Sequence, residues 1–226
     1  MELRQKNQLL RTMLTQLAVR KIGKIWANTQ APYSALVYEC KLLRDDKVFL
    51  DDLSKYLDKN PIIHQSVSTL LAHIAMAANA RWQDTPRAVQ MLSRRGWHIG
   101  RWIPTFLIID GPLARLFKDK HSPIVRLLKL KYSEYPILSQ ARDIFIHDEF
   151  RLIRNGIGHW SFIWEDKEPD DLIQIFDEKT NRCTLTITKS DAEAFHLTAF
   201  SIVEILDVNL LTPANYRLVK ASASPQ

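Results

Sequence analysis

Residues that interrupt or cross-link a chain are scarce in this sequence, which has six glycines, ten prolines and two cysteines among 226 residues. So little glycine and proline excludes collagen-like and low-complexity chains. The two cysteines, Cys40 and Cys183, are 143 positions apart, so they form neither a metal-ligand motif nor a disulfide framework. This cysteine usage indicates two reduced thiols in a cytoplasmic protein. We expect no metal site and no cofactor.

Long hydrophobic runs are absent as well. The longest near-continuous apolar stretch, residues 102–109, is interrupted by Pro104 and Thr105 and is far too short to span a bilayer. No apolar segment follows the charged residues at the N-terminus, so we expect no signal peptide. We therefore expect a cytoplasmic location and no membrane partner.

The composition is that of an ordinary globular protein, with 46% hydrophobic and 25% charged residues. A chain of this length can bury a sizeable core without help from metals or disulfides. We expect a single helical domain over residues 1–220. Its N-terminal helices would occupy residues 1–80, a motif-bearing part residues 81–220, and a disordered tail residues 221–226.

Charge is distributed unevenly along the chain. The formal net charge is +6, but residues 81–131 hold eleven lysines and arginines against three aspartates and glutamates, a net +8. Residues 165–204 hold four basic and ten acidic residues, a net −6. Such asymmetry is typical of a protein with a nucleic-acid-facing side, although solvated helix faces produce basic stretches too.

Apolar residues at spacings of three and four predict a mostly helical chain. The predicted helices cover residues 3–27, a segment from near 34, 51–57, 62–82, a segment starting at Thr85-Pro86, 113–120, 122–132 and 137–153. The pattern changes after residue 160. Runs at 172–176 and 183–188, separated by a turn-like segment, predict a β-hairpin. The fold class we predict is therefore all-α with one small β-hairpin near the C-terminus.

A last amphipathic helix follows the predicted hairpin. Ser190 and Glu193 fit a capping box, in which Ser190 caps the amide of Glu193 and the glutamate reaches back. The helix is expected to run to about Val208, with apolar residues on one face. These are Phe195, Ala199, Phe200, Val203 and Leu206.

The loop at residues 93–102 mixes arginines with tryptophans. Aromatic rings can stack on unpaired bases while arginines hold phosphates, so we single out Arg94, Arg95, Trp97 and Arg101 as candidate RNA-binding residues. The alternative is that Trp97 and Trp102 are core residues and the arginines are solvated, because tryptophans are highly buried on average.

The stretch with the most chemistry is Arg154-Asn155-Gly156-Ile157-Gly158-His159, at the end of an apolar helical segment. A regular helix would rotate Arg154 and His159 about 140° apart, so a kink or a helix end at one of the two glycines is needed to bring them together. Arg151, one turn earlier, is a further candidate for RNA binding. Trp160 and Trp164, which flank the motif, are expected to be core or dimer-interface residues.

Two other segments satisfy the same loose pattern. Arg142 and His147 have the same spacing, and Arg115 and His121 have five residues between them. The asparagine, the small Gly-Ile-Gly filling and the apolar lead-in favour the Arg154 site over these. The pair Arg142 and His147 remains an alternative.

The residue types at this site suit RNA cleavage without a metal. A histidine near neutral pKa can take a proton from a ribose 2′-hydroxyl or give one to a leaving oxygen. An arginine can bind the phosphate bidentately and stabilise charge that develops on its oxygens. Asn155 can orient either group.

The motif Arg154-Asn155-x-x-x-His159 resembles that of the HEPN superfamily, and the helical body followed by a hairpin and a last helix is similar too. The resemblance implies a HEPN-like helical bundle and a metal-independent endoribonuclease, in which Arg154, Asn155 and His159 from two copies form a composite dimeric site. It further implies a toxin or an antiviral defence effector, with a possible antitoxin or nucleotidyltransferase partner. Some HEPN toxins have a modified tyrosine two residues after the histidine, where this chain has Ser161.

A second hypothesis belongs to a different class of function. The chain can be a non-catalytic helical RNA-binding or scaffold protein of the same fold. Retained RNA binding without cleavage would distinguish this hypothesis from the ribonuclease.

Overall fold

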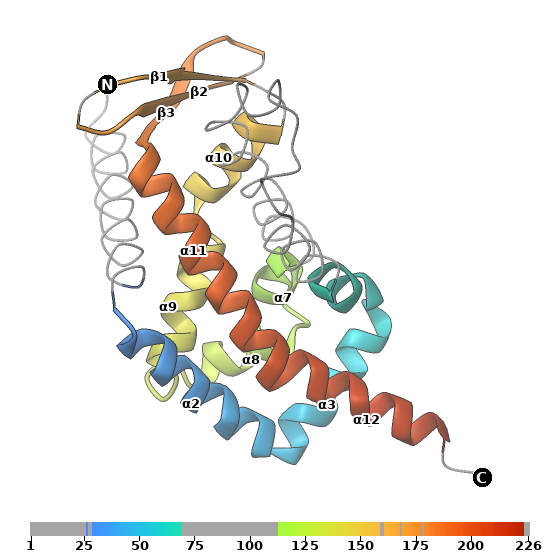
Figure 1. Ribbon diagram of the computed structural model, residues 1–226. Helices are drawn as coiled ribbons and strands as arrows, with labels where there is room; N and C mark the ends of the chain where they lie inside the picture. Colours follow the sequence, from blue (N-terminus) through green and yellow to red (C-terminus); the bar gives the residue numbers. More distant parts are fainter. Residues whose placement is uncertain are drawn as a thin grey trace, which may run out of the picture.

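The computed structural model describes residue 26, residues 29–68 and residues 113–223 except 159, 160, 168 and 178; at 150, 154, 157, 158 and 218–223 only the backbone is described. Within these residues the chain is mostly helical, with one small antiparallel sheet (Figure 1). The helices are α2 (Ala31–Asp45), α3 (Lys47–Lys59), α7 (Ala114–Lys118), α8 (Pro123–Leu130), α9 (Pro136–Phe145), α10 (Asp148–Gly158), α11 (Lys189–Leu206) and α12 (Thr212–Ala223). Residues 61–68 are helical as well. The strands are β1 (Phe162–Glu165), β2 (Leu172–Phe176) and β3 (Cys183–Thr188).

One hydrophobic cluster runs through the described residues and joins segments far apart in the sequence. Helix α2 packs against α9 and α11, and α3 packs against α12 (Figure 1). The buried side chains of α2 recur at helical spacing, as the sequence pattern requires, and include Leu36, Cys40 and Leu43. The beginning and the end of the described chain therefore share one core.

A buried carboxylate ties α2 to α9. The Glu39 side chain accepts hydrogen bonds from the amides of Ile137 at 3.1 Å and Leu138 at 2.7 Å. Both amides are in the first turn of α9, where backbone N–H groups have no partner within the helix. The negative charge also complements the positive end of the helix dipole. Glu39 is only 6% exposed, so its buried charge is compensated by these two bonds.

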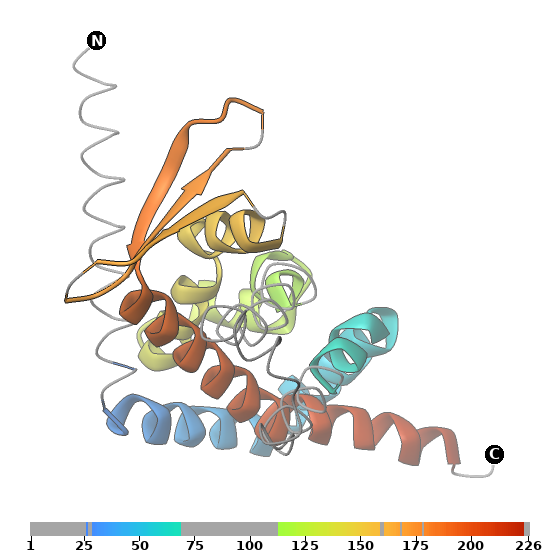
Figure 2. The same cartoon turned by 45° about the horizontal axis from the view of Figure 1, so that its top comes forward.

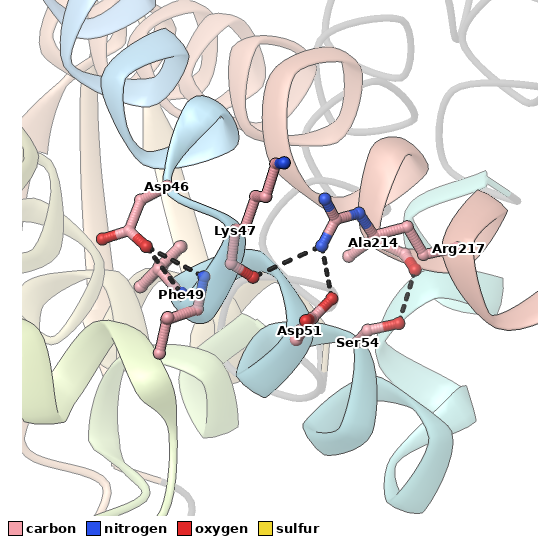
Figure 3. A network of polar contacts seen from close by, with 8 residues as sticks. Asp46, Lys47, Phe49, Asp51, Ser54, Ala214 and Arg217 are labelled. Atoms are coloured by element: carbon pink, nitrogen blue, oxygen red, sulfur yellow. Dashed lines mark hydrogen bonds and ion pairs between the residues drawn. The ribbon is translucent and has the colours of Figure 1, made fainter.

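Polar contacts fasten α12 to α3 at the edge of this core (Figure 3). The hydroxyl of Ser54 donates to the carbonyl of Ala214 at 2.7 Å, and Arg217 pairs with Asp51 and donates to the carbonyl of Lys47. Asp46 caps the N-terminus of α3 through the amides of Val48 and Phe49.

The last helical segment is longer than the sequence predicts, because α11 continues through the π-helical turn η3 (Asp207–Leu211) into α12. Pro213 has no amide hydrogen, and its ring would clash with the carbonyl four residues earlier in a regular helix. The wide turn, in which the Thr212 amide donates to the Asp207 carbonyl, accommodates it. Asn209 donates its side-chain amide to the carbonyl of Ile205 at 2.8 Å.

The continuous helix Lys189–Arg217 is long and apolar enough to span a membrane. Most of its apolar stretch is buried within the protein, where α11 packs against α2, α9 and β3. Its apolar character is therefore explained by its position in the core.

Helices α7 and α9 are joined by a stacked aromatic pair and a side-chain hydrogen bond. The rings of Phe117 and Phe145 stack with their centroids 5.1 Å apart, and Arg142 Nε donates to the Phe117 carbonyl at 3.1 Å. Phe117 is fully buried and Phe145 nearly so. This contact fixes the position of the end of α9, from which α10 continues.

The sheet is a three-stranded antiparallel meander in the order β1-β2-β3. The predicted pairing of 172–176 with 183–188 in a hairpin is confirmed. The prediction that this hairpin is the whole sheet was wrong, because β1 pairs with β2 as a third strand. Ile173 and Ile175 of β2 are buried on the face that α10 covers, and α11 continues directly from β3 (Figure 2). The coarse prediction of a mostly helical chain with a small sheet holds.

Three boundaries differ from the predictions. The helix predicted over 137–153 is two helices, because the chain breaks at Ile146 and His147 between α9 and α10. The N-cap of the last helix is Thr188, two residues before the predicted Ser190, since its hydroxyl accepts from the Asp191 amide at 3.1 Å. Helix α12 continues to Ala223, three residues into the segment predicted as a tail.

Candidate functional site

Helix α10 carries the arginine and the asparagine of the candidate motif. Arg154 and Asn155 lie in its second half, and the helix ends at Gly158, the residue before His159. The side chain of Arg154 and the whole of His159 lie outside the described residues, so their separation stays a prediction. Asn155 is half-buried. The helix end expected near the glycines is thus found at Gly158, while Gly156 continues the helix.

Gly156 has a packing role, since it is buried where α10 meets β2. A Cβ at this position would overlap Ile175 Cγ2 and come within 3.1 Å of Ile175 Cγ1. Only a residue without a side chain lets the helix approach the sheet this closely. The glycine between Arg154 and His159 therefore sets the position of the motif helix on the sheet.

A second contact connects the helix end to the sheet. The amide of Ser161 donates to the carbonyl of Gly156 at 2.8 Å, and the carbonyl of Ser161 accepts from the amide of Phe176 at 2.8 Å. The first bond satisfies a carbonyl that the end of a helix leaves without an intrahelical partner. The two residues that flank positions 157–160 are therefore tied to each other, and one of them is tied to β2.

The beginning of α10 is capped by His147. Its Nδ1 accepts the amide of Glu149 at 3.3 Å, as an N-cap side chain does. Arg151, a candidate RNA-binding residue, is exposed one turn later and pairs with Asp148 at 3.4 Å. Arg151 is therefore available at the surface of the helix that carries the motif.

The alternative pair, Arg142 and His147, has structural roles in this fold. Arg142 donates to the Phe117 carbonyl and lies 3.7 Å from Asp143, while the His147 ring caps α10. Burial raises the pKa of the Asp143 carboxyl, with Arg142 and His147 opposing that shift. These contacts give the arginine, the acidic residue and the histidine structural roles at this position.

In the third match to the loose pattern, Arg115 lies in α7 and His121 lies in the turn between α7 and α8. Asp119 accepts from the His121 amide at 2.9 Å and from the Tyr56 hydroxyl at 3.1 Å. The backbone hydrogen bond from His121 lowers the pKa of Asp119, and burial together with Asp119 raises the pKa of Tyr56. His121 itself is exposed.

The candidate RNA-binding residues Arg94, Arg95, Trp97 and Arg101 lie outside the described residues, as does Trp160. Trp164 is half-buried against the core and donates its indole N–H to Asp171 at 2.9 Å. The sequence predicted a core or a dimer-interface position for it, and its packing against the core agrees with the first of these. The basic loop itself stays a prediction.

No group of three or more histidine, cysteine or acidic side chains suited to a metal occurs among the residues that the structure describes.

A buried polar cluster at the π-helical turn was missed by sequence reasoning. Asp207 is 8% exposed, receives the Thr212 hydroxyl at 3.4 Å and lies 4.0 Å from His64 Nε2. Burial raises the pKa of Asp207, with His64 and then Thr212 opposing the shift. The signal available in the sequence was a pair of polar residues, Asp207 and Asn209, inside an apolar helical run close to Pro213.

Comparison with known proteins found no matching family model, no similar curated protein and no similar solved structure. The functional inference therefore rests on this chain's own residues and on the motif resemblance.

Proposed function

We propose that this protein is a metal-independent endoribonuclease of the HEPN type, with Arg154, Asn155 and His159 as its site and two copies of the chain forming it. RNA is the substrate, and a toxin or antiviral defence role follows from the resemblance. In this proposal His159 moves the proton of the ribose 2′-hydroxyl or of the leaving oxygen, and Arg154 binds the phosphate.

The observation that carries the proposal is the end of α10 at Gly158. A continuous helix would direct positions 154 and 159 to different sides. Helix α10 contains Arg154 and extends to Gly158, and Gly156 is fixed on Ile175, so the backbone of the arginine is on a rigid element. A catalytic pair needs this kind of fixed support to hold its geometry.

A second observation favours this pair over its competitor. The ring nitrogen of His147 and the guanidinium of Arg142 already make hydrogen bonds that hold helices together. The cap uses Nδ1, one of the two ring nitrogens of His147, so the orientation of this ring is set by the helix that it caps. The proposal assigns the proton transfer to His159, and the His147→Asn variant tests that choice.

The test is cleavage of single-stranded RNA in EDTA by the full chain and by Arg154→Ala and His159→Ala. The matched controls are Arg182→Ala, an exposed arginine in the β2–β3 turn, and His147→Asn, which keeps a capping side chain. Attack by the 2′-hydroxyl leaves a 2′,3′-cyclic phosphate, which mass spectrometry of the 5′ fragment detects. Cleavage by both alanine variants at the wild-type rate would remove the site assignment, and bound but uncleaved RNA would favour the scaffold hypothesis.

The dimer is tested separately by light scattering. We expect the mass of two chains at the concentrations that support cleavage. A monomer that cleaves RNA would contradict the composite site while leaving the catalytic residues in place.

A further inference from the structure

Helices α7 and α8 and the turn between them lie in a strongly basic segment of the chain. Residues 113–131 hold six lysines and arginines and a single acidic residue, Asp119. The five cations that we call the α7–α8 surface are all exposed. They are Arg115, Lys118, Lys120, Arg126 and Lys129.

The burial pattern of the two helices explains why these cations face solvent. In α8 the buried residues include Ile124, Val125 and Leu128, so Arg126 and Lys129 lie together on the opposite side. In α7 the buried Leu116 and Phe117 leave the remaining side to the cations. Each helix thus places its apolar face in the core and its basic face outward.

Few carboxylates neutralise this surface. Arg126 pairs with Asp52 at 2.8 Å, whereas Arg115, Lys118, Lys120 and Lys129 form no ion pair with another described residue. Asp119 accepts hydrogen bonds from Tyr56 and from the His121 backbone. An uncompensated group of like charges is unfavourable for the isolated fold and is typical of a surface that binds a polyanion.

Exposed apolar side chains interleave with the lysines at the end of α8. Leu130 is 84% exposed and Tyr132 is 56% exposed, next to Lys129 and Lys131. Lys131 pairs with Glu134 at 3.1 Å. A solvated charged face alone does not require an exposed tyrosine, whereas a single-stranded nucleic acid uses cations for its phosphates and aromatic rings for its bases.

We propose that the α7–α8 surface binds single-stranded RNA, with the cations on its phosphates and Tyr132 stacked on a base. This inference rests on the proposed function for its choice of RNA and names residues outside the α10 motif. Arg126 and Lys129 are three residues apart in α8, about 4.5 Å along the helix axis, so they lie close enough to bind neighbouring phosphates of one strand. Single strands are favoured over duplex because only unpaired bases offer a face to Tyr132.

The test is fluorescence anisotropy with a labelled single-stranded RNA and the His159→Ala chain, so that cleavage does not interfere. Lys118→Gln/Lys129→Gln is compared with Lys179→Gln/Arg182→Gln, which removes two exposed cations from the β2–β3 turn. We expect the first pair to weaken binding and to reduce the slope of log affinity against log salt by about 1.4, at about 0.7 per phosphate contact. The second pair should leave both nearly unchanged.

Tyr132→Ala tests the base contact, with Tyr132→Phe as the variant that keeps the ring. The loss of stacking predicts at least a five-fold weaker complex for the alanine variant and near wild-type affinity for phenylalanine. Equal affinity of all the variants for RNA would overturn the proposal. The proposal would also be overturned if these variants lost binding to phosphatidylserine vesicles while their affinity for RNA stayed unchanged. That result would identify the surface as one that binds a membrane.

The outcomes separate this inference from the proposed function. RNA binding that depends on Lys118 and Lys129, in a chain that cleaves no RNA, supports the α7–α8 surface and contradicts the ribonuclease. RNA cleavage by a chain whose binding ignores these lysines contradicts the surface and keeps the ribonuclease.

Discussion

Gly156 of α10 lies directly against Ile175 of β2, so closely that a Cβ on the glycine would overlap the isoleucine Cγ2. The glycine is between Arg154 and His159 in the sequence. The contact therefore connects the packing of the helix on the sheet to the position of the candidate catalytic residues.

Gly156→Ala is expected to destabilise the protein by about 1–2 kcal/mol. Overpacking costs about 1–3 kcal/mol, and the better helix propensity of alanine returns up to about 1 kcal/mol. Urea unfolding measures this change. Because Ile175→Ala removes the atoms that clash, the double variant should be more stable than the sum of the two single changes predicts. Strict additivity would contradict the close contact.

Glu39→Ala is expected to lower the free energy of unfolding by about 1.5–3 kcal/mol, because one buried and one half-buried amide of α9 lose a charged acceptor. Glu39→Gln keeps one oxygen acceptor and should lose less. Urea unfolding of the three proteins gives the order. An alanine variant as stable as wild type would show that Glu39 does not cap α9.

The two cysteines should differ sharply in reactivity. Cys183 is exposed, whereas Cys40 is fully buried and burial raises the pKa of its thiol to about 12. A thiol reagent at pH 8 should therefore modify one cysteine of the native protein quickly and the second only on unfolding. Cys183→Ser should abolish the fast phase. Rapid labelling of Cys40 in that variant would contradict its position in the core.

Asp207 should make stability depend on pH. Burial raises its native pKa above the ordinary value of 3.8, so the native state binds a proton more tightly than the unfolded state. Its favourable contribution is present below 3.8 and is lost as the pH rises through the native pKa. Asp207→Asn stays neutral and still accepts from Thr212, so its stability relative to wild type should grow between pH 3.5 and 5.5.

Unfolding at several pH values in that interval checks this prediction. A constant difference between Asp207→Asn and wild type across the interval would contradict a raised pKa for Asp207.

Much of the helical fold was predictable because local pattern decides it. The apolar spacing that predicted helices at 113–120 and 122–132 is the burial pattern of α7 and α8. Both strands of the hairpin were also marked by alternation and by the turn between them. In these segments the residues that form each element are neighbours in the sequence.

Features that depend on distant contacts were missed. The break between α9 and α10 lies in an unbroken apolar pattern, and it is held by the His147 cap and by the bond from Arg142 to Phe117, 25 positions away. Strand β1 has four residues and is defined by its pairing with β2. A run that short carries too little pattern to be recognised alone.

The candidate site also has features that were predictable from the sequence and features that were not. The residue types and their spacing were visible in the sequence, and so was the need for a helix end near the glycines. The contact between Gly156 and Ile175 could not be predicted, because it depends on a sheet whose strands come later in the chain. The same holds for the position of the helix end at Gly158.

The most direct measurement for the proposed function is the single-turnover rate of cleavage of a short single-stranded RNA in EDTA by wild type, His159→Ala and His147→Asn. Loss of a general acid or base predicts a rate about 10²–10⁴ times lower for His159→Ala. His147→Asn should cleave at close to the wild-type rate because asparagine can replace the cap. Equal rates for His159→Ala and wild type, or a large loss in His147→Asn alone, would contradict the assignment of the site to Arg154 and His159.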